Sequence, residues 1–225
     1  EDPARKQALM NIVVVGGGAS GVEIAGAVAE MKKNIIARDY PDLDSSQMHI
    51  YLVNAADRLL SAMDPVSSKR AERDLKELHV HIRQPQFATE YKDGILKTSA
   101  GLEIPTQTVI WVSGICANTV EGFPAESIGH AGRFLTDRFC RVKGVKDVYA
   151  IGDVSLVEGD EEYPLGHPQL AQVAMQQAKT VAKNFKAMSK GKELKPFKYK
   201  NLGVMATIGR NHAVAEISGK KFGGF

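Results

Sequence analysis

The chain has 225 residues, of which 44% are hydrophobic and 24% charged, and its formal net charge is +3. This is the composition of a globular protein with one or two domains, and the small basic surplus does not indicate nucleic-acid binding. Two cysteines are too few for a disulfide framework. No apolar run approaches the roughly 18 residues of a spanning helix, and no signal peptide opens the chain. Secreted miniproteins, membrane-spanning proteins and collagen-like proteins are therefore excluded.

The first part of the chain predicts alternating strands and helices. Apolar runs and helical periodicity predict strands at 11–15, 49–53 and 80–82, and helices at 22–38 and 67–78. Because crossovers between strands of one sheet are right-handed, these strands should be parallel. The expected fold class is therefore α/β, with a Rossmann-like parallel sheet.

Turn residues organise the middle of the chain. The pair Asp93-Gly94 lies between strand-like runs and predicts a hairpin within a β-meander from 87 to 104. A buried strand at 108–113 follows, and a domain boundary is expected between Gly114 and Phe123, where Gly, Asn and Pro accumulate.

The remainder of the chain predicts strands at 139–142 and 148–151, a helix from about 168 to 188, and a hairpin of 204–208 with 213–217.

The glycine pattern Gly16-x-Gly18-x-x-Gly21 lies between the first predicted strand and the first predicted helix. Gly16 permits a tight turn, Gly18 lacks the Cβ that would block a diphosphate, and Gly21 is expected to let the helix pack closely on the sheet. The helix N-terminus then supplies N–H donors and a partial positive charge. This context predicts a dinucleotide site, and the alternative is a flavodoxin-like sheet with a fortuitous glycine loop.

Three nearby side chains bear on which nucleotide binds. Asn54 stands where the fingerprint expects an acidic residue that binds the ribose, so a 2′-phosphate is not repelled there. Arg58 lies one turn further on and could reach such a phosphate. NADH is the first choice, with NADPH tolerated, although a solvated surface charge explains Arg58 more simply. Glu23 is explained either by the helix dipole or by a contact with the nicotinamide carboxamide.

Two further motifs follow in the second half. Gly152-Asp153 ends a predicted strand, where a carboxylate can accept hydrogen bonds from sugar hydroxyls, although Gly-Asp is also common in simple turns. Gln172 and Gln176 share one helix face, and could bind a polar head group or form a solvated pair.

In this order, the motifs resemble the type II NADH dehydrogenases (NADH:quinone oxidoreductases), flavoproteins of the pyridine nucleotide-disulfide oxidoreductase-like superfamily. The matching segments are 13–26, 111–114, 149–153, Ala171-Gln172-x-x-x-Gln176 and 205–210. The resemblance implies the cofactors NADH and FAD, hydride transfer from NADH to the flavin, and electron transfer to a quinone. It implies cofactor-binding residues Gly16, Gly18, Ala19, Ser20, Gly21, Glu23, Asn54, Ser113, Gly114, Gly152, Asp153, Ala171 and Gln172, and catalytic residues Glu23, Gln172 and Gln176.

The resemblance also implies a division of the chain. Residues 9–116 would form the NAD(H)-binding domain, 117–192 the returning part of an FAD-binding domain, and 193–225 the start of a C-terminal β and membrane-anchor region. The family's N-terminal FAD fingerprint and C-terminal anchor helices have no counterpart here, so the chain is expected to be a soluble fragment that is inactive alone and binds FAD weakly. The full-length protein would lie on the cytoplasmic face of the inner membrane.

Several alternatives and absences complete these expectations. A nucleotide-binding sensor without turnover is one alternative, and an enzyme similar to sulfide:quinone oxidoreductase, which uses redox cysteines, is another. Lone histidines lack metal-ligand spacing, so no metal is expected, nor is a nucleic-acid partner. A homodimer is left open.

Overall fold

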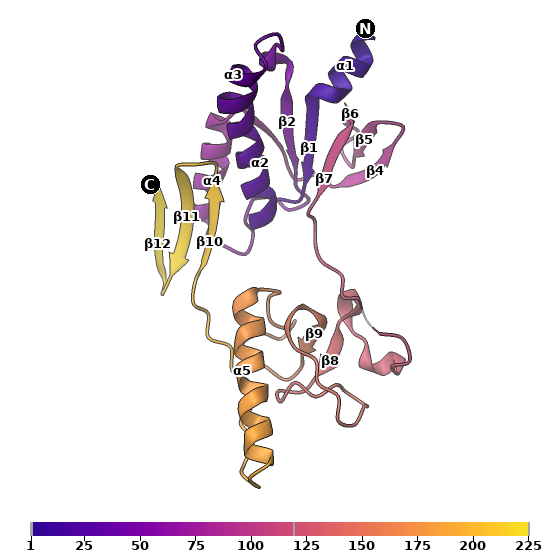
Figure 1. Cartoon of the computed structure of the whole chain (residues 1–225), viewed down its shortest axis with the longest axis vertical. Helices are drawn as coiled ribbons and strands as arrows, with labels where there is room; N and C mark the ends of the chain where they lie inside the picture. The colour runs from indigo at the N-terminus through magenta and orange to yellow at the C-terminus, as the bar shows by residue number, and fades with distance from the viewer. Residues whose placement is uncertain (1, 119, 225) are drawn as a thin grey trace. The chain divides into compact units, whose positions relative to one another are not determined.

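The computed structural model describes residues 2–118 and 120–224 (Figure 1). These residues form two compact units. The first unit contains the chain up to Gly114 and again from Gly203 onward, and the second unit contains Ile115–Leu202.

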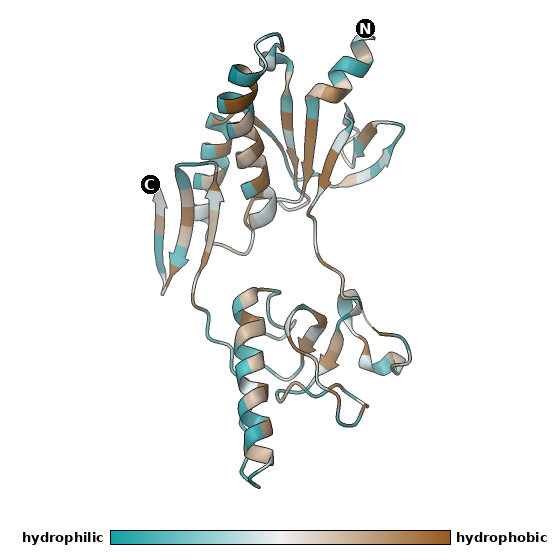
Figure 2. Ribbon diagram, viewed as in Figure 1, coloured by the Kyte–Doolittle hydropathy of each residue, from teal (hydrophilic) through white to brown (hydrophobic). Residues whose placement is uncertain are grey.

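A four-stranded parallel sheet forms the centre of the first unit. Its strands are β1 (Asn11–Val15), β2 (His49–Val53), β3 (Val80–Arg83) and β7 (Thr108–Trp111), in the order β3-β2-β1-β7. Every pairing in this sheet is parallel. The expected α/β fold with a parallel sheet is therefore confirmed, and the apolar residues that make β1 a central strand are visible in Figure 2.

Helices cover one face of this sheet. The helices are α2 (Ala19–Met31) and α4 (Pro65–Glu77), and a π-helical turn (Lys32–Ile36) and α3 (Ala37–Asp39) continue α2. Val22 and Ala25 of α2 and Leu75 of α4 are fully buried against the strand residues Val14 and Leu52. The pattern thus places the helices correctly, although α2 begins three residues before the predicted Val22.

The β-meander covers the opposite face. It consists of β4 (Ala88–Lys92), β5 (Ile95–Thr98) and β6 (Glu103–Pro105). Asp93 and Gly94 both have positive φ, 51° and 76°, as the two central residues of a type I′ hairpin turn require. Leu96 is buried against Val13 and Val15, so the predicted hairpin is present and supplies the second half of the core.

One helix was not expected from the sequence. The helix α1 (Pro3–Met10) has Pro at its start, and the Asp2 carboxylate caps it by accepting a 3.0 Å hydrogen bond from the Ala4 N–H. The Asp-Pro pair is a helix-start pattern that the polar composition of the segment conceals.

The C-terminal residues form an antiparallel sheet. Its strands are β10 (Val204–Ile208), β11 (His212–Ile217) and β12 (Lys220–Gly224), so the predicted hairpin is present and gains a third strand. Residues 193–225 were expected as one region, yet the structure divides them between the units at Leu202 and Gly203. The reason is packing: Phe197 is buried in the core of the second unit, whereas Ala206 and Ile208 are buried with α2.

The second unit is built around α5 (Ala171–Met188) and a parallel pair, β8 (Phe134–Thr136) with β9 (Ser155–Val157). Short 3₁₀ turns accompany them at Ala125–Ser127, His130–Gly132 and Gly152–Val154, and a further one, Ser45–Gln47, lies in the first unit. Val173 and Val181 of α5 are buried against Val157, Phe197 and Tyr199.

The strands predicted at 139–142 and 148–151 are wrong. These segments make only isolated bridges, Thr136 with Val142 and Arg141 with Tyr149. Cys140 and Asp147 have φ of 64° and 60°, which interrupts an extended backbone. Within the described residues, no helix is long and apolar enough to span a bilayer.

Candidate functional site

The glycine loop joins β1 to α2 through two close backbone approaches. Gly16 has φ of 121°, and a Cβ on it would lie 2.8 Å from the Val112 carbonyl oxygen, so no other residue fits. A Cβ on Gly21 would lie 1.7 Å from the Gly16 carbonyl oxygen. Gly21 therefore lets the helix start pack on the loop itself, rather than on the sheet as the sequence suggested, although Leu52 lies just beyond.

Gly18 differs from both of these glycines. Its φ of −73° and ψ of −175° are open to any residue, and a Cβ built on it would meet nothing within 4 Å. Gly18 is the N-cap of α2, no side chain caps the helix there, and Ala19 and Ser20 are exposed. The space in front of Gly18, at the uncapped start of a 13-residue helix, is thus open, and helix N-termini of this kind are general binding sites for phosphates.

Asn54 anchors the glycine loop. Its side chain is buried, Oδ1 accepts a 3.2 Å hydrogen bond from the Gly17 N–H, and Nδ2 donates to the carbonyls of Ala56 (3.1 Å) and Arg58 (3.0 Å) and to Gln84 Oε1 (3.3 Å). The donors of this amide are therefore used within the protein. The ribose contact expected of Asn54 stays a prediction, and what the structure shows is a residue that shapes the loop.

Arg58 is held by its own loop. Nη1 donates to the Met63 carbonyl at 2.6 Å and Nη2 to the Ser61 carbonyl at 2.7 Å. These bonds favour a structural role for Arg58 over a contact with a 2′-phosphate.

Glu23, in the second turn of α2, contacts β10. Its Oε1 accepts hydrogen bonds from the Thr207 N–H at 3.2 Å and from Thr207 Oγ1 at 3.4 Å. The sequence placed Thr207 in the matching segment 205–210 but did not connect it to Glu23, because the two residues are 184 positions apart and no local pattern links them.

The segment after β7 lies beside the glycine loop. Trp111, the chain's single tryptophan, pairs with Val15 in the sheet and is exposed. The Val112 N–H donates to the Val15 carbonyl at 2.9 Å, and Ser113 and Gly114 follow at the same carboxyl edge. Gly114 has φ of 87° with open space around it. The structure thus brings the predicted residues Gly16 and Ser113 side by side at the carboxyl edge of the sheet.

In the second unit, Gly152 and Asp153 follow the expected order at the start of a 3₁₀ turn. The Gly152 N–H donates to Gln177 Oε1 at 2.6 Å, and Gln177 is almost completely buried. Gln177 lies on the buried face of α5 with Val173 and Val181. The four-residue spacing of these positions is visible in the sequence and could have identified Gln177 as a buried residue, but the sequence analysis did not single it out. The Asp153 side chain is exposed and able to accept hydroxyl donors.

A buried histidine fixes the segment that leads into α5. His167 Nε2 lies 3.3 Å from Asp160 Oδ2, and the rings of Tyr163 and Phe197 pack against the imidazole. Arg133 donates to the His167 carbonyl at 3.2 Å. Burial lowers the pKa of His167, although Asp160 opposes this shift.

The two glutamines of α5 bind the chain that follows it. Gln176 Oε1 accepts a hydrogen bond from the Lys200 N–H at 3.0 Å, and its Nε2 donates to the Lys200 carbonyl at 2.9 Å. Gln172 Oε1 accepts one from the Leu202 N–H at 2.9 Å. The structure therefore places the amides of Gln172 and Gln176 on one face of α5, which begins at Ala171. Contact of these amides with a quinone stays a prediction.

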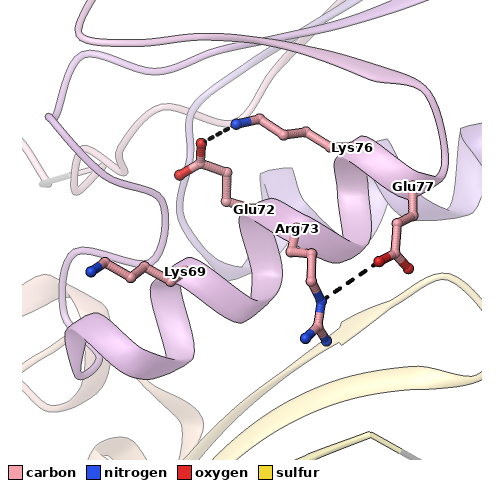
Figure 3. Close-up of a pocket in the computed structure, with 5 residues that line it drawn as sticks. All are labelled: Lys69, Glu72, Arg73, Lys76 and Glu77. Carbon is pink, nitrogen blue, oxygen red and sulfur yellow. Dashed lines mark hydrogen bonds and ion pairs between the residues drawn. The ribbon is translucent and has the colours of Figure 1, made fainter.

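A cavity of about 690 Å³ lies along α4 in the first unit, and charged side chains line it (Figure 3). Lys76 pairs with Glu72 at 2.6 Å, and Arg73 with Glu77 at 3.7 Å, each one turn apart on the same helix. Such pairs are typical of a solvated helix face, and we assign no ligand to this cavity.

A parallel sheet with a glycine loop and a helix N-terminus at its carboxyl edge is the arrangement typical of nucleotide-binding α/β proteins. Residues 1–178 match the family of pyridine nucleotide-disulphide oxidoreductases, and the chain belongs to this family. Two curated relatives are the type II NADH:quinone oxidoreductases NdhA and Ndh of Mycobacterium tuberculosis, 32% and 33% identical over all of this chain. A third, the type II NADH:quinone oxidoreductase of Haemophilus influenzae, is 30% identical over 94% of the chain.

The chain spans about half the length of these curated relatives, 49% of the two mycobacterial proteins and 47% of the Haemophilus protein. They bear out the resemblance drawn from the motifs. Among solved structures, NDH2 from Plasmodium falciparum in complex with NADH superposes with a TM-score of 0.85 at 17% identity, covering 98% of this chain and 60% of that one. This likeness confirms the fold.

Proposed function

We propose that the first unit binds NADH and that the chain is part of an FAD-dependent NADH:quinone oxidoreductase. The observation that carries the proposal is the open space at Gly18 in front of the uncapped N-terminus of α2. The names of the curated relatives support the same activity. The diphosphate would be held by the backbone N–H groups after Gly18, and the helix dipole would favour its charge.

The second unit offers a partial site for FAD. Gly152 is held in position by buried Gln177, and the exposed Asp153 carboxylate fits a hydroxyl-rich chain. When bound, the flavin would supply hydride acceptance from NADH and electron transfer to a quinone. The protein's own part is to bind and orient, with Gln172 and Gln176 of α5 near the acceptor as the resemblance implies.

The nucleotide is proposed to be NADH, with NADPH accepted. Asn54 carries no charge that would repel a 2′-phosphate, and Arg58 is bonded to its own loop, so neither residue discriminates strongly. Measuring Kd for both reduced nucleotides tests this statement, and NADPH binding more than about tenfold tighter than NADH would contradict it.

One of the two cysteines, Cys140, is poorly suited to a thiol-based mechanism, whereas Cys116 is exposed. Cys140 is buried, and burial raises the pKa of its thiol to about 12, which leaves almost no thiolate at neutral pH. Blocking both thiols in the longer protein should therefore leave NADH oxidation unchanged, whereas loss of turnover would favour the sulfide:quinone oxidoreductase alternative.

The decisive experiment joins the remaining, N-terminal part of an FAD-binding domain to the chain. Under anaerobic conditions NADH should bleach the flavin absorbance, and added quinone should restore it. Nucleotide binding without bleaching would instead identify a sensor. If the protein shows no nucleotide binding and no bleaching, the proposed function is refuted altogether.

We also propose that the longer protein associates with the cytoplasmic face of a membrane. Sedimentation of the protein with lipid vesicles would test whether it binds a membrane.

A further inference from the structure

One contact in the first unit joins the phosphate-binding helix to the C-terminal sheet. Glu23 lies in the second turn of α2, and its Oε1 accepts two hydrogen bonds from Thr207 of β10, at 3.2 Å from the backbone nitrogen and 3.4 Å from Oγ1. Neither the fold nor the diphosphate site requires the hydroxyl of Thr207, because the backbone N–H already donates.

The strand and the helix are held at backbone contact distance. β10 is an edge strand in the order β10-β11-β12, so one row of its N–H groups faces away from β11, and Glu23 accepts the N–H of Thr207 from this row. A Cβ on Gly26 would lie 2.5 Å from the Gly209 nitrogen. Because this approach fixes β10 against α2, the Glu23 carboxylate is held in one orientation.

The second oxygen of the carboxylate is left for a ligand. Both bonds from Thr207 go to Oε1, and in the described part of the chain Oε2 accepts no hydrogen bond. An ionised carboxylate is a pure acceptor, so Oε2 suits an N–H donor. NADH carries a primary amide on the nicotinamide, at the end of the molecule away from the adenosine.

We propose that Thr207 is a positioning residue, which orients Glu23 so that Oε2 accepts a hydrogen bond from the nicotinamide carboxamide. This inference rests on the proposed NADH site. Thr207 itself does not contact the nucleotide. It determines which rotamer the acid adopts and therefore how strongly the nicotinamide half of the ligand is bound, without affecting the diphosphate half.

Titration calorimetry of the 225-residue chain with NADH and with ADP-ribose tests the proposal, because ADP-ribose keeps the diphosphate and lacks the nicotinamide. Thr207→Val removes the hydroxyl at an exposed position and retains the backbone bond. We expect it to weaken NADH binding about three- to tenfold and to leave ADP-ribose binding unchanged. Thr207→Ser should restore NADH affinity. The matched control is Thr89→Val, at an exposed threonine of β4 whose Oγ1 donates to the Lys97 carbonyl.

A double-mutant cycle separates an effect through Glu23 from a general one. In a Glu23→Ala background, Thr207→Val should cause no further loss of NADH affinity. Equal weakening of NADH and ADP-ribose by Thr207→Val would mean a merely structural role and would overturn the inference, as would unchanged NADH affinity. These outcomes leave the proposed function standing, whereas failure of the unaltered chain to bind either nucleotide would refute the proposed function and the inference together.

Discussion

Substitution of Gly18 by Val separates nucleotide binding from folding. The backbone at Gly18 is extended, with φ of −73° and ψ of −175°, and a Cβ there meets no protein atom within 4 Å. The folded chain therefore accommodates Val without a clash. Val is a poorer N-cap than Gly, and Gly itself costs entropy in the unfolded chain, so these opposing terms should leave the free energy of unfolding within about 1 kcal/mol.

The expected loss in binding is larger. The valine side chain would occupy the space in front of the N–H groups of α2, where the diphosphate is expected. Two charge-assisted hydrogen bonds of about 1.5–3 kcal/mol each would be lost, together about 3–6 kcal/mol. NADH affinity should therefore fall by at least about a hundredfold.

Two measurements on the same preparation check this expectation. Quenching of the Trp111 fluorescence, beside the glycine loop, reports NADH binding, and a thermal scan should show Tm within about 4 °C of the unsubstituted chain. Ala27→Val is the matched control, because Ala27 is exposed on the same helix beyond the loop. NADH affinity within threefold of the original in Gly18→Val would refute the argument that this space holds a diphosphate.

Three further predictions concern the residues that support the site. Asn54→Ala removes the acceptor for Gly17 and should lower the free energy of unfolding by about 2–4 kcal/mol and weaken NADH binding, measured by denaturant titration and calorimetry. Gly26→Ala should lower Tm, although helix propensity alone favours Ala by about 1 kcal/mol, because its Cβ would lie 2.5 Å from the backbone nitrogen of Gly209, directly after β10; a raised Tm would contradict this. Burial lowers the pKa of His167, so the unfolded chain binds a proton that the folded chain excludes, and stability should fall as pH drops below about 6.5. His167→Gln should flatten this pH dependence, whereas His130→Gln, at an exposed histidine, should not.

Local patterns in the sequence determined the elements that depend on near neighbours. The strand, glycine turn and helix at 11–31, the Asp93-Gly94 hairpin and the long helix of the second unit were each predicted close to their observed positions. These features follow from side-chain periodicity and from the φ that each residue tolerates, and both properties act over a few residues. The glycine pattern Gly16-x-Gly18-x-x-Gly21, on which the proposed nucleotide site depends, is likewise a local pattern.

Only the tertiary structure decided which distant groups meet. The sequence shows only that Asn54 follows a strand. In the structure its side chain is buried and accepts a hydrogen bond from the Gly17 N–H, so it shapes the glycine loop. Thr207 reaches Glu23 across 184 positions because Gly26 admits β10 to the surface of α2. Apolar composition likewise suggested a strand around Cys140, yet its positive φ ended extended structure there. Long-range packing sets such outcomes, because the free energy of a side chain depends on neighbours that its local sequence does not specify.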